Sequence, residues 1–284
     1  MNTCDLDAIN GHALNTFVSK DQSIGELLAL PAYYGFVDTP HDFVMFLGGN
    51  DDGIALRYFY DQPFEEMTIP IWKSLVQDAK LILDVGAHTG TYSLLSALNS
   101  KADVYAFEPF LPNFSRLLLN LRANHVNRVL AIPRAASSTE GTFDFSINSS
   151  MWYLSSGGHL GNDGKHRIAV STCKIDSYTK DKHVDLIKID TEGHEPFVIQ
   201  GAMQTIAASK PTLMLEWNNY TSGIEDIKQT EDFLHNQGYK FYAVDDKEKK
   251  LFAVDTFRDR GSEFERNFFA AAREDHVAIL SMYL

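Results

Sequence analysis

Residues 81–90 read Leu81-Ile82-Leu83-Asp84-Val85-Gly86-Ala87-His88-Thr89-Gly90, and a helix-like pattern follows from residue 91 to residue 98. The apolar run predicts a buried strand of a parallel sheet, whose strands carry few polar residues. A strand, a glycine turn and a helix in this order are typical of a nucleotide-type site at the carboxyl end of such a sheet. Glycines let the backbone approach a ligand, and the N-terminus of a helix favours a carboxylate or phosphate. The segment therefore predicts an α/β fold with a ligand site at this turn.

The composition is that of a globular protein. The 284 residues suffice for one large α/β domain with an N-terminal extension, and 44% of them are hydrophobic. The formal charge of −13 argues against nucleic acid as the main partner, because acidic proteins repel phosphate backbones. The polar N-terminus and the lack of ~18 consecutive apolar residues predict neither a secretion signal nor a membrane span. Cys4 and Cys173 stand far apart, which favours reduced thiols and a cytoplasmic location. The oligomeric state stays open.

Residues 1–79 lack a regular alternation of strands and helices, and we expect them to form a cap on a main domain of residues 80–284. Within this cap, residues 24–30 predict a short helix. Residues 43–47 and 54–60 predict the two strands of a hairpin, because the segment between them is rich in Gly, Asn and Asp. Residues 68–77 predict a helix with Pro70 in its first turn, where its missing donor is tolerated.

From residue 80 onward the alternation becomes regular. Strands are predicted at 81–85, 104–107, 129–133, 184–190 and 212–217, with helical patterns between them and a further helix at 224–236. Residues 239–244 and part of 266–273 predict a closing pair of strands, and the charge run 245–250 predicts a solvated turn. Strands separated by helices imply a mostly parallel, Rossmann-like sheet with helices on both faces.

The region 138–180 interrupts this alternation. It is rich in Gly, Asn and Ser and includes the aromatic pair Trp152 and Tyr153. Long irregular segments inside a domain are often functional loops, so we interpret the region as a lid-like insertion. An insertion on the surface without a role is the alternative.

Glu108 lies 18 residues after Gly90, at the predicted end of the second strand. A carboxylate there can accept both hydroxyl groups of a ribose, although an ordinary first-turn acid of the next helix is the alternative. Glu108 could accept the ribose hydroxyls of NAD in the same way. The spacing Asp84-x-Gly86-x-x-x-Gly90, however, is not the G-x-G-x-x-G of dinucleotide sites. It resembles the first motif of S-adenosylmethionine-dependent methyltransferases, in which the acid and the turn hold the methionine end of the cofactor.

Further residues complete the expected cofactor site. His88 and Thr89 belong to the same turn, and a polar His88 can bond the carboxylate of the cofactor. Ala135 and Ala136 follow the third predicted strand, where small side chains would let an adenine ring approach the backbone.

A second motif reads Asp185-Leu186-Ile187-Lys188-Ile189-Asp190-Thr191-Glu192-Gly193-His194-Glu195-Pro196. It predicts a buried strand that ends in Asp190, whose carboxylate points into the ligand crevice. The acids and the histidine after the strand predict a reaction centre with Asp190, Glu192 and His194 as catalytic residues. First-turn acids of the following helix are the alternative for Glu192 and Glu195.

The two motifs and the Phe107-Glu108-Pro109 turn together resemble the FkbM-type methyltransferase family over about residues 64–245. The resemblance implies a seven-stranded class I methyltransferase fold and O-methylation, often of sugar or polyketide hydroxyls, with S-adenosylmethionine as cofactor. It assigns Asp84, Gly86 and Gly90 to the methionine end, Glu108 to the ribose and Asp190 to the transfer site. His88 departs from the family, which commonly has Asn at this position.

For the transfer step we expect Asp190 as general base, with His194 as second candidate because an ordinary histidine pKa suits the task. We expect Trp152, Tyr153, Glu216, Trp217 and Asn218 to contact a small-molecule or glycan acceptor, with Tyr220 as a further stacking residue. A metal-assisted version, with Mg²⁺ held by Asp190, Glu216 and Asn218, is an alternative that we do not favour.

Two other classes of function stay open at this point. One is a nicotinamide-dependent oxidoreductase with a Rossmann-type fold, since Glu108 alone fits either cofactor. The other is a non-catalytic binding protein that uses a methyltransferase-like fold. The acids Asp84, Glu108, Asp190 and Glu192 argue against the second.

Overall fold

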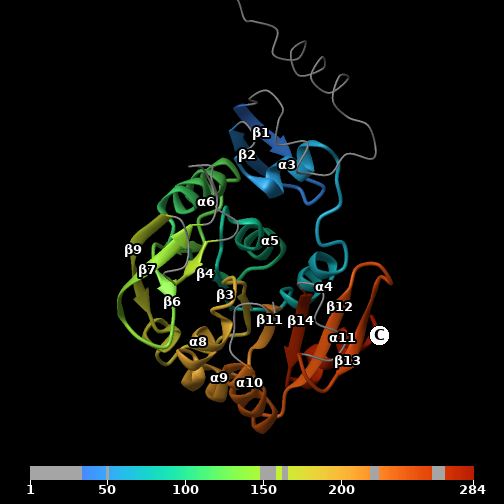
Figure 1. Cartoon of the computed structure of the whole chain (residues 1–284). Coiled ribbons are helices and arrows are strands. Elements are labelled where there is room, and N and C mark those ends of the chain that lie inside the picture. Colours follow the sequence, from blue (N-terminus) through green and yellow to red (C-terminus); the bar gives the residue numbers. More distant parts are fainter. Residues whose placement is uncertain (1–33, 49–50, 148–157, 162–165, 218–223, 258–265) are drawn as a thin grey trace, which may run out of the picture. The chain divides into compact units, whose positions relative to one another are not determined.

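The computed structural model in Figure 1 describes residues 34–48, 51–147, 158–161, 166–217, 224–257 and 266–284. The chain divides into two compact units, residues 1–64 and residues 65–284. The expected helix at 24–30 lies outside the described residues, as do Trp152, Tyr153, Asn218 and Tyr220. No helix within the described ranges combines the length and the apolar character that a membrane span requires.

The first unit contains an antiparallel hairpin of β1 (Tyr34–Asp38) and β2 (Val44–Gly48), followed by α3 (Gly53–Phe59). The predicted strand at 54–60 is therefore wrong, and β2 pairs with the segment before it instead. The physical reason is the N-cap of α3, where Asp52 Oδ1 accepts hydrogen bonds from the backbone N of Ile54 (2.9 Å) and Ala55 (3.1 Å). This cap satisfies free N–H groups of the first turn and starts a helix.

The second unit is built on an eight-stranded sheet with the order β13-β12-β14-β11-β10-β3-β4-β5. Five neighbouring strands are parallel: β5 (Val129–Ile132), β4 (Asp103–Phe107), β3 (Leu81–Val85), β10 (Leu186–Ile189) and β11 (Thr212–Trp217). The remaining strands are β14 (Arg266–Ala271), which is antiparallel to β11 and to β12 (Lys240–Asp245), and β13 (Lys250–Val254) at the edge. The predicted Rossmann-like, mostly parallel sheet is confirmed.

The strand count exceeds the predicted seven by one, because β13 was not expected. The charge run 245–250 makes the turn between β12 and β13, where Asp245 Oδ1 accepts hydrogen bonds from the backbone N of Lys247 and Glu248, each at 3.0 Å. An Asp that bonds the backbone two and three residues ahead favours such a turn. The chain then returns as an additional edge strand.

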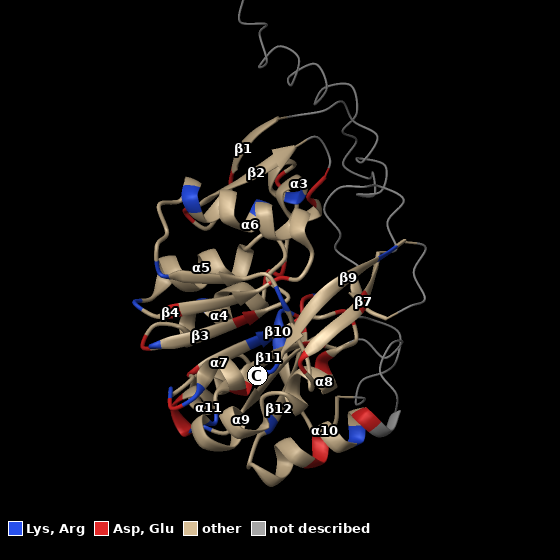
Figure 2. Cartoon of the chain, turned by 90° about the vertical axis from the view of Figure 1, so that its left-hand side faces the viewer, with Lys and Arg blue, Asp and Glu red and all other residues tan. Residues whose placement is uncertain are grey.

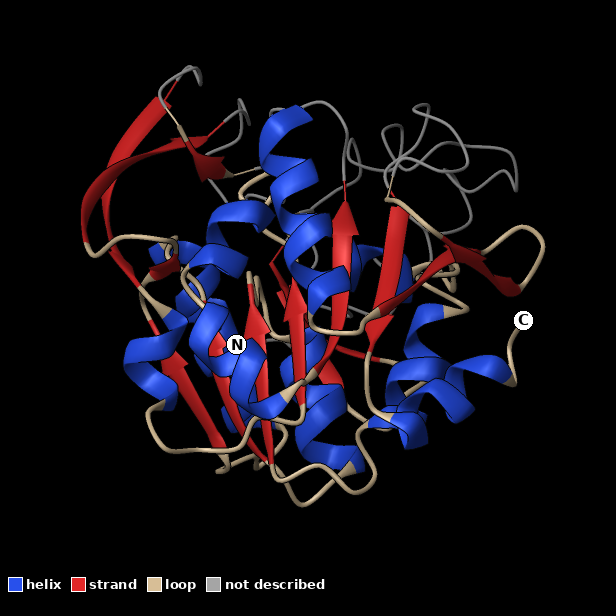
Figure 3. Cartoon of the chain, turned by 90° about the horizontal axis from the view of Figure 1, so that it is seen from below, coloured by secondary structure: helices blue, strands red, loops and turns tan. Residues whose placement is uncertain are grey.

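Helices lie on both faces of this sheet (Figure 3). One group contains α4 (Thr68–Leu75), α5 (Thr91–Asn99) and α11 (Glu274–Ser281), in which α4 contacts both others. The other group contains α7 (Ile175–Thr179), α8 (Glu195–Gln200), α9 (Met203–Ser209) and α10 (Ile224–Asn236), with contacts between α7 and α9 and between α8 and α10. Helix α6 (Leu111–Ala123) contacts β5. The predicted helices at 68–77 and 224–236 are confirmed.

The region 138–180 is not irregular where the structure describes it. Strands β6 (Ala135–Ala136), β9 (His166–Cys173), β7 (Gly141–Ile147) and β8 (His159–Leu160) form a second sheet in this order. Phe145 is buried opposite Ile168, and it packs with Phe110 and Val170 in a small core. The expectation of an irregular segment is therefore corrected: Thr142 to Ile147 alternate polar and apolar residues, as a strand does. Its role as a lid stays a prediction.

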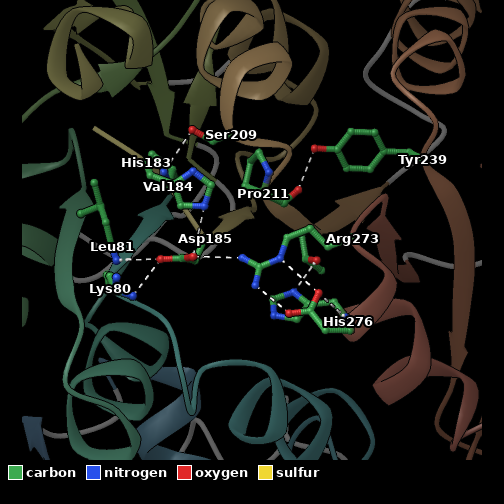
Figure 4. Close-up of polar contacts among 12 residues, drawn as sticks. Lys80, Leu81, His183, Val184, Asp185, Ser209, Pro211, Tyr239, Arg273 and His276 are labelled. Carbon is green, nitrogen blue, oxygen red and sulfur yellow. Dashed lines mark hydrogen bonds and ion pairs between the residues drawn. The ribbon is translucent and has the colours of Figure 1, made fainter. Parts of the chain in front are cut away.

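Asp185 precedes β10, at the opposite end of the strand from Asp190. Its carboxylate joins three segments of the chain (Figure 4). Its Oδ2 accepts hydrogen bonds from the backbone N of Lys80 (2.8 Å) and Leu81 (3.2 Å), and its Oδ1 lies 3.0 Å from Arg273 Nη1. Burial acts to raise the pKa of Asp185, but the two N–H groups and the guanidinium outweigh it and lower the pKa. This member of the second motif stabilises the fold and lies away from the ligand edge.

We expect Asp185→Asn to destabilise the protein by about 2–3 kcal/mol at neutral pH, because Arg273 loses its buried partner. Since the folded-state pKa is lowered, the difference in stability between wild type and variant is full above the unfolded pKa of about 3.9 and declines as the pH falls from there through the folded-state pKa. Denaturant unfolding at pH 7 and pH 3 measures both values. Asp181→Asn, the same change at an exposed position, is the control, and an equal loss in both variants would contradict the prediction.

Candidate active site

The two glycines of the β3–α5 turn are required by the packing of the fold. Gly86 has φ +77°, and a Cβ atom there would lie 1.7 Å from the backbone oxygen of Asp190. Gly90 has φ +98° at the N-cap of α5, and a Cβ atom there would lie 2.5 Å from Leu117 Cδ1. The end of β10 therefore packs directly against the turn, which brings the two sequence motifs together. That Gly86 and Gly90 take part in cofactor binding remains a prediction.

His88 occupies a position with left-handed backbone, at φ +49°. Glycine is the residue most at ease in this region, and Asn, Asp and His are the non-glycine residues enriched there. The departure from Asn at this position is therefore compatible with the same turn. The backbone N of His88 donates to Glu108 Oε2 at 2.9 Å, and its Nδ1 lies 3.2 Å from Thr89 Oγ1. Buried Asn120 donates to the backbone oxygen of Thr89 at 2.8 Å and holds the turn in place.

Glu108 follows β4 and is buried beside this turn. Its two oxygens accept hydrogen bonds from the backbone N of His88 and of Phe110, each at 2.9 Å, and the Asn113 side chain donates to the same carboxyl. Burial outweighs these donors and raises the pKa of Glu108 to about 8. A carboxylate has about four lone pairs, so acceptor capacity remains after these contacts. The structure thus brings Glu108 and the Gly86–Gly90 turn together.

A charged cluster lies across the adjacent strands β3 and β10, which carry one acid and one base among otherwise apolar residues (Figure 2). Asp84 on β3 and Lys188 on β10 are register partners, and both are buried. Lys188 Nζ lies 2.8 Å from Asp190 Oδ2. Asp84 Oδ2 accepts a hydrogen bond from Ser93 Oγ at 2.6 Å, whereas its Oδ1 has no hydrogen-bond partner within the described part of the chain.

Two more carboxyls complete the cluster. Glu216 on β11 hydrogen-bonds Asp190, and repulsion by Asp190 together with burial raises the pKa of Glu216 to about 10. Burial also acts to raise the pKa of Asp190, but the Lys188 ammonium outweighs it and holds that pKa low. At neutral pH the pair therefore contains an ionised Asp190 and a protonated Glu216. Glu65 accepts a hydrogen bond from the Tyr92 hydroxyl, and burial raises its pKa to about 7.

Sequence reasoning missed Glu65. It precedes α4, far from both motifs along the chain, and no pattern around it distinguishes it from the neighbouring Glu66. Only the packing of this segment against α5 places its side chain near Lys188 and Asp190.

The loop after Asp190 is held by Glu195. Its Oε1 accepts hydrogen bonds from the backbone N of Thr191 (2.9 Å) and of Gly193 (3.0 Å), and from Thr191 Oγ1 (3.0 Å). Within this loop Glu192 and Gly193 have φ values of +55° and +96°. Glu195 thus shapes the loop, and Glu192 is partly exposed on it.

His194 lies against the segment after β6. Its Nε2 is 2.9 Å from Ser137 Oγ, and its ring stacks on Phe197 at 4.7 Å between centroids. Ser137 directly follows Ala135 and Ala136, which are buried in β6. Burial lowers the pKa of His194 to about 4, so the imidazole is neutral and weakly basic. The ordinary pKa on which its candidacy as a base rested is not kept in the structure.

His194 gives the protein a pH-dependent stability. Because its folded-state pKa lies below the unfolded value of about 6.5, the stabilisation is present above that value and is lost as the pH falls toward 4. We expect wild type to lose about 2 kcal/mol more than His194→Asn between pH 7 and pH 4.5. Denaturant unfolding across this range measures the loss, with His125→Asn at an exposed position as control. Parallel curves for wild type and His194→Asn would contradict the assignment.

Of the predicted acceptor contacts, Glu216 lies in the charged cluster and Trp217 lies in the core. Trp217 is 2% exposed and stacks on Phe257 at 4.8 Å between centroids. The other three, Trp152, Tyr153 and Asn218, lie outside the described residues. Among the described residues, no group of three or more His, Cys, Asp and Glu side chains is arranged to hold a metal ion.

These features define a Rossmann-like α/β domain whose polar site lies at the carboxyl ends of its central parallel strands. The sequence matches the model of the methyltransferase FkbM domain over residues 84–241, and the chain belongs to this family. The matched range includes both motifs and Glu216. Among curated proteins, none matches the sequence.

Many solved structures resemble the chain, among them the following three. Methyltransferase FkbM from Methylobacillus flagellatus is 17% identical with a TM-score of 0.47, over 77% of this chain and 51% of that protein. An S-adenosylmethionine-dependent O-methyltransferase from Thermotoga maritima is 13% identical with a TM-score of 0.42, over 82% of this chain and 78% of that one. An rRNA methylase from Streptococcus thermophilus is 11% identical with a TM-score of 0.43, over 73% and 94%.

The chain thus spans about half the length of the Methylobacillus flagellatus protein. At such identities and TM-scores, none of the three similarities informs the acceptor of this protein.

Proposed function

We propose that this protein is an S-adenosylmethionine-dependent O-methyltransferase that acts on a hydroxyl group of a sugar, a glycan or a natural product. Membership of the FkbM family supports methyl transfer. The observation that carries the proposal is the acid pair of Asp190 and Glu216, next to Lys188 and to the Gly86 turn. A hydroxyl is a poor nucleophile, and an ionised carboxylate suits the removal of its proton.

The residues around the turn fit S-adenosylmethionine. In the proposal, Asp84, Gly86, His88, Thr89 and Gly90 hold the methionine end, Glu108 the ribose, and Ala135 with Ala136 the adenine. Two buried acceptors support this fit: Asp84 Oδ1, which has no hydrogen-bond partner among the described residues, and the carboxylate of Glu108 with its remaining lone pairs.

The bound cofactor would supply an activated methyl group on a sulfonium. Asp190 would orient the acceptor hydroxyl and receive its proton as the oxygen takes the methyl group, whose bond to the sulfonium sulfur breaks to leave a neutral thioether. Glu216 stays protonated and donates its hydrogen bond to Asp190, which leaves Asp190 as the ionised member of the pair. Lys188 compensates the charge of Asp190 before the proton arrives.

The acceptor and the location are parts of the same proposal. A small molecule or glycan is favoured over nucleic acid by the formal charge of −13. A cytoplasmic location is supported by the buried, unbridged thiol of Cys173. The proposed acceptor contacts are Trp152, Tyr153, Glu216, Trp217 and Asn218. Because Trp217 is buried, we expect it to support the acceptor site without direct contact with the acceptor.

Thermal unfolding with two competing ligands tests the proposed function. S-adenosylhomocysteine is expected to raise the unfolding midpoint, since a ligand at about 100 times its Kd stabilises the folded state by about 2.7 kcal/mol. NADH at the same concentration is expected to leave the midpoint unchanged. A shift with NADH and none with S-adenosylhomocysteine would replace the proposal with an oxidoreductase, and no shift with either would favour a protein that binds neither.

A further inference from the structure

Lys188 is a buried base in the middle of the central sheet. Its side chain is 5% exposed, its Nζ lies 2.8 Å from Asp190 Oδ2 and 3.5 Å from the backbone oxygen of Gly86, and the ring centroid of Tyr92 is 5.2 Å away. A buried ammonium is costly unless it is paired and hydrogen-bonded. An apolar residue at this position would avoid that cost, so the presence of Lys188 requires an explanation.

Charged and titratable groups face Lys188 from every element packed against it. They are Asp84 of β3, Asp190 at the end of β10, Glu216 of β11, Glu65 ahead of α4 and Tyr92 of α5. Among them, the contact of Lys188 Nζ with Asp190 is the direct ion pair. Asp84 is the register partner of Lys188, but its Oδ2 bonds Ser93.

The geometry of the strand explains the pair. Lys188 and Asp190 stand two residues apart on an extended segment, so their side chains project to the same face. Asp190 is thereby held through Oδ2, and Glu216 on the neighbouring strand bonds the same carboxyl. Two contacts from different directions fix the orientation of a carboxylate whose side chain is still 26% exposed. An exposed carboxylate without them would rotate freely.

We propose that Lys188 is a positioning residue whose ion pair with Asp190 fixes the orientation of that carboxylate toward the acceptor hydroxyl. This inference rests on the proposed function, in which Asp190 receives the proton of the acceptor. Lys188 itself contacts no reacting atom. The competing role is that of a structural counter-ion for the buried Asp84.

A double-mutant cycle in thermal unfolding tests the pairing without any assay of activity. Lys188→Met and Asp190→Asn are expected to lower the midpoint by less together than the sum of the two single effects, because each single change leaves one charge unpaired. Lys188→Met with Asp84→Asn is the parallel cycle for the structural role. Coupling of Lys188 to Asp84 alone would overturn the proposal.

The catalytic consequence is measured with labelled S-adenosylmethionine and a panel of monosaccharides. Lys188→Met is expected to lower kcat about 100-fold while the Kd for S-adenosylhomocysteine stays within about threefold, since orientation of the base is lost whereas Glu108 and Asn120 still hold the cofactor turn. Lys188→Arg restores part of kcat, because its guanidinium also pairs with a carboxylate. Lys101→Met, the same change at an exposed lysine, leaves kcat unchanged.

The outcomes separate the two proposals. A wild type that neither binds S-adenosylhomocysteine nor methylates any sugar contradicts the proposed function, and the unfolding cycle then decides the pairing alone. An unchanged kcat in Lys188→Met, or an unfolding cycle in which Lys188 couples to Asp84 and not to Asp190, contradicts the positioning role.

Discussion

Asp190→Asn is expected to lower methyl transfer by about 10²–10⁴-fold, the usual contribution of a positioned general base. The amide has nearly the shape of the carboxylate but cannot receive the proton of the acceptor. The variant is expected to bind S-adenosylhomocysteine within a few fold of wild type, since the Gly86 turn and Glu108 are unchanged. Transfer of the labelled methyl group, together with calorimetric titration of the cofactor product, measures the two quantities.

Two comparisons make the result specific. Glu192→Gln changes a partly exposed acid of the same loop that the sequence also predicts as catalytic, and we expect a smaller effect because Asp190 is the proposed base and Glu195 holds the loop. Asp181→Asn repeats the substitution at an exposed position. Full activity of Asp190→Asn would remove Asp190 from the mechanism, and an equal loss in Glu192→Gln would point to the loop as a whole.

Gly86→Ala is expected to have the largest effect on folding. The added Cβ would lie 1.7 Å from the backbone oxygen of Asp190, and the position has φ +77°. A backbone atom cannot rotate away as a side chain does, so β3 and β10 must separate. We expect a loss of at least about 3 kcal/mol, or about 10 °C in the unfolding midpoint, together with loss of cofactor binding.

Gly53→Ala is the matched control, because a Cβ atom at Gly53 meets no atom within 4 Å. It begins α3, and we expect a change of less than about 1 kcal/mol there, since Ala favours a helix over Gly. A Gly86→Ala variant as stable as wild type would show that the close approach of the turn to Asp190 is not needed.

The central sheet was predictable because its strands are buried on both faces and read as continuous apolar runs. Residues 81–85 and 212–217 form strands with these bounds, and 224–236 forms a helix. The placement of Glu108 beside the glycine turn follows from the same logic, since carboxyl ends of neighbouring parallel strands meet at one edge. These features follow from the local sequence pattern and from the general topology of parallel α/β sheets.

Other features depend on tertiary contacts that the sequence does not display. The Gly-, Asn- and Asp-rich segment before residues 54–60 suggested a hairpin, but the Asp52 cap makes these residues a helix. Glu65 joins the site only through packing against α5, and Trp217, an apparent acceptor contact, is enclosed by the core. His194 shows the same limit, because burial changes the pKa from which its role was inferred.

The central claim is that the turn of residues 86–90 and Glu108 hold S-adenosylmethionine. Calorimetric titration of S-adenosylhomocysteine into wild type and Glu108→Gln tests it most directly. We predict one binding site in wild type and an affinity at least about tenfold lower in the variant, because the new amide NH2 replaces one of the two oxygens that accept from the backbone N of His88 and of Phe110 and that would accept from the ribose. Absence of binding to a folded wild type, or equal affinity in both proteins, would contradict the account.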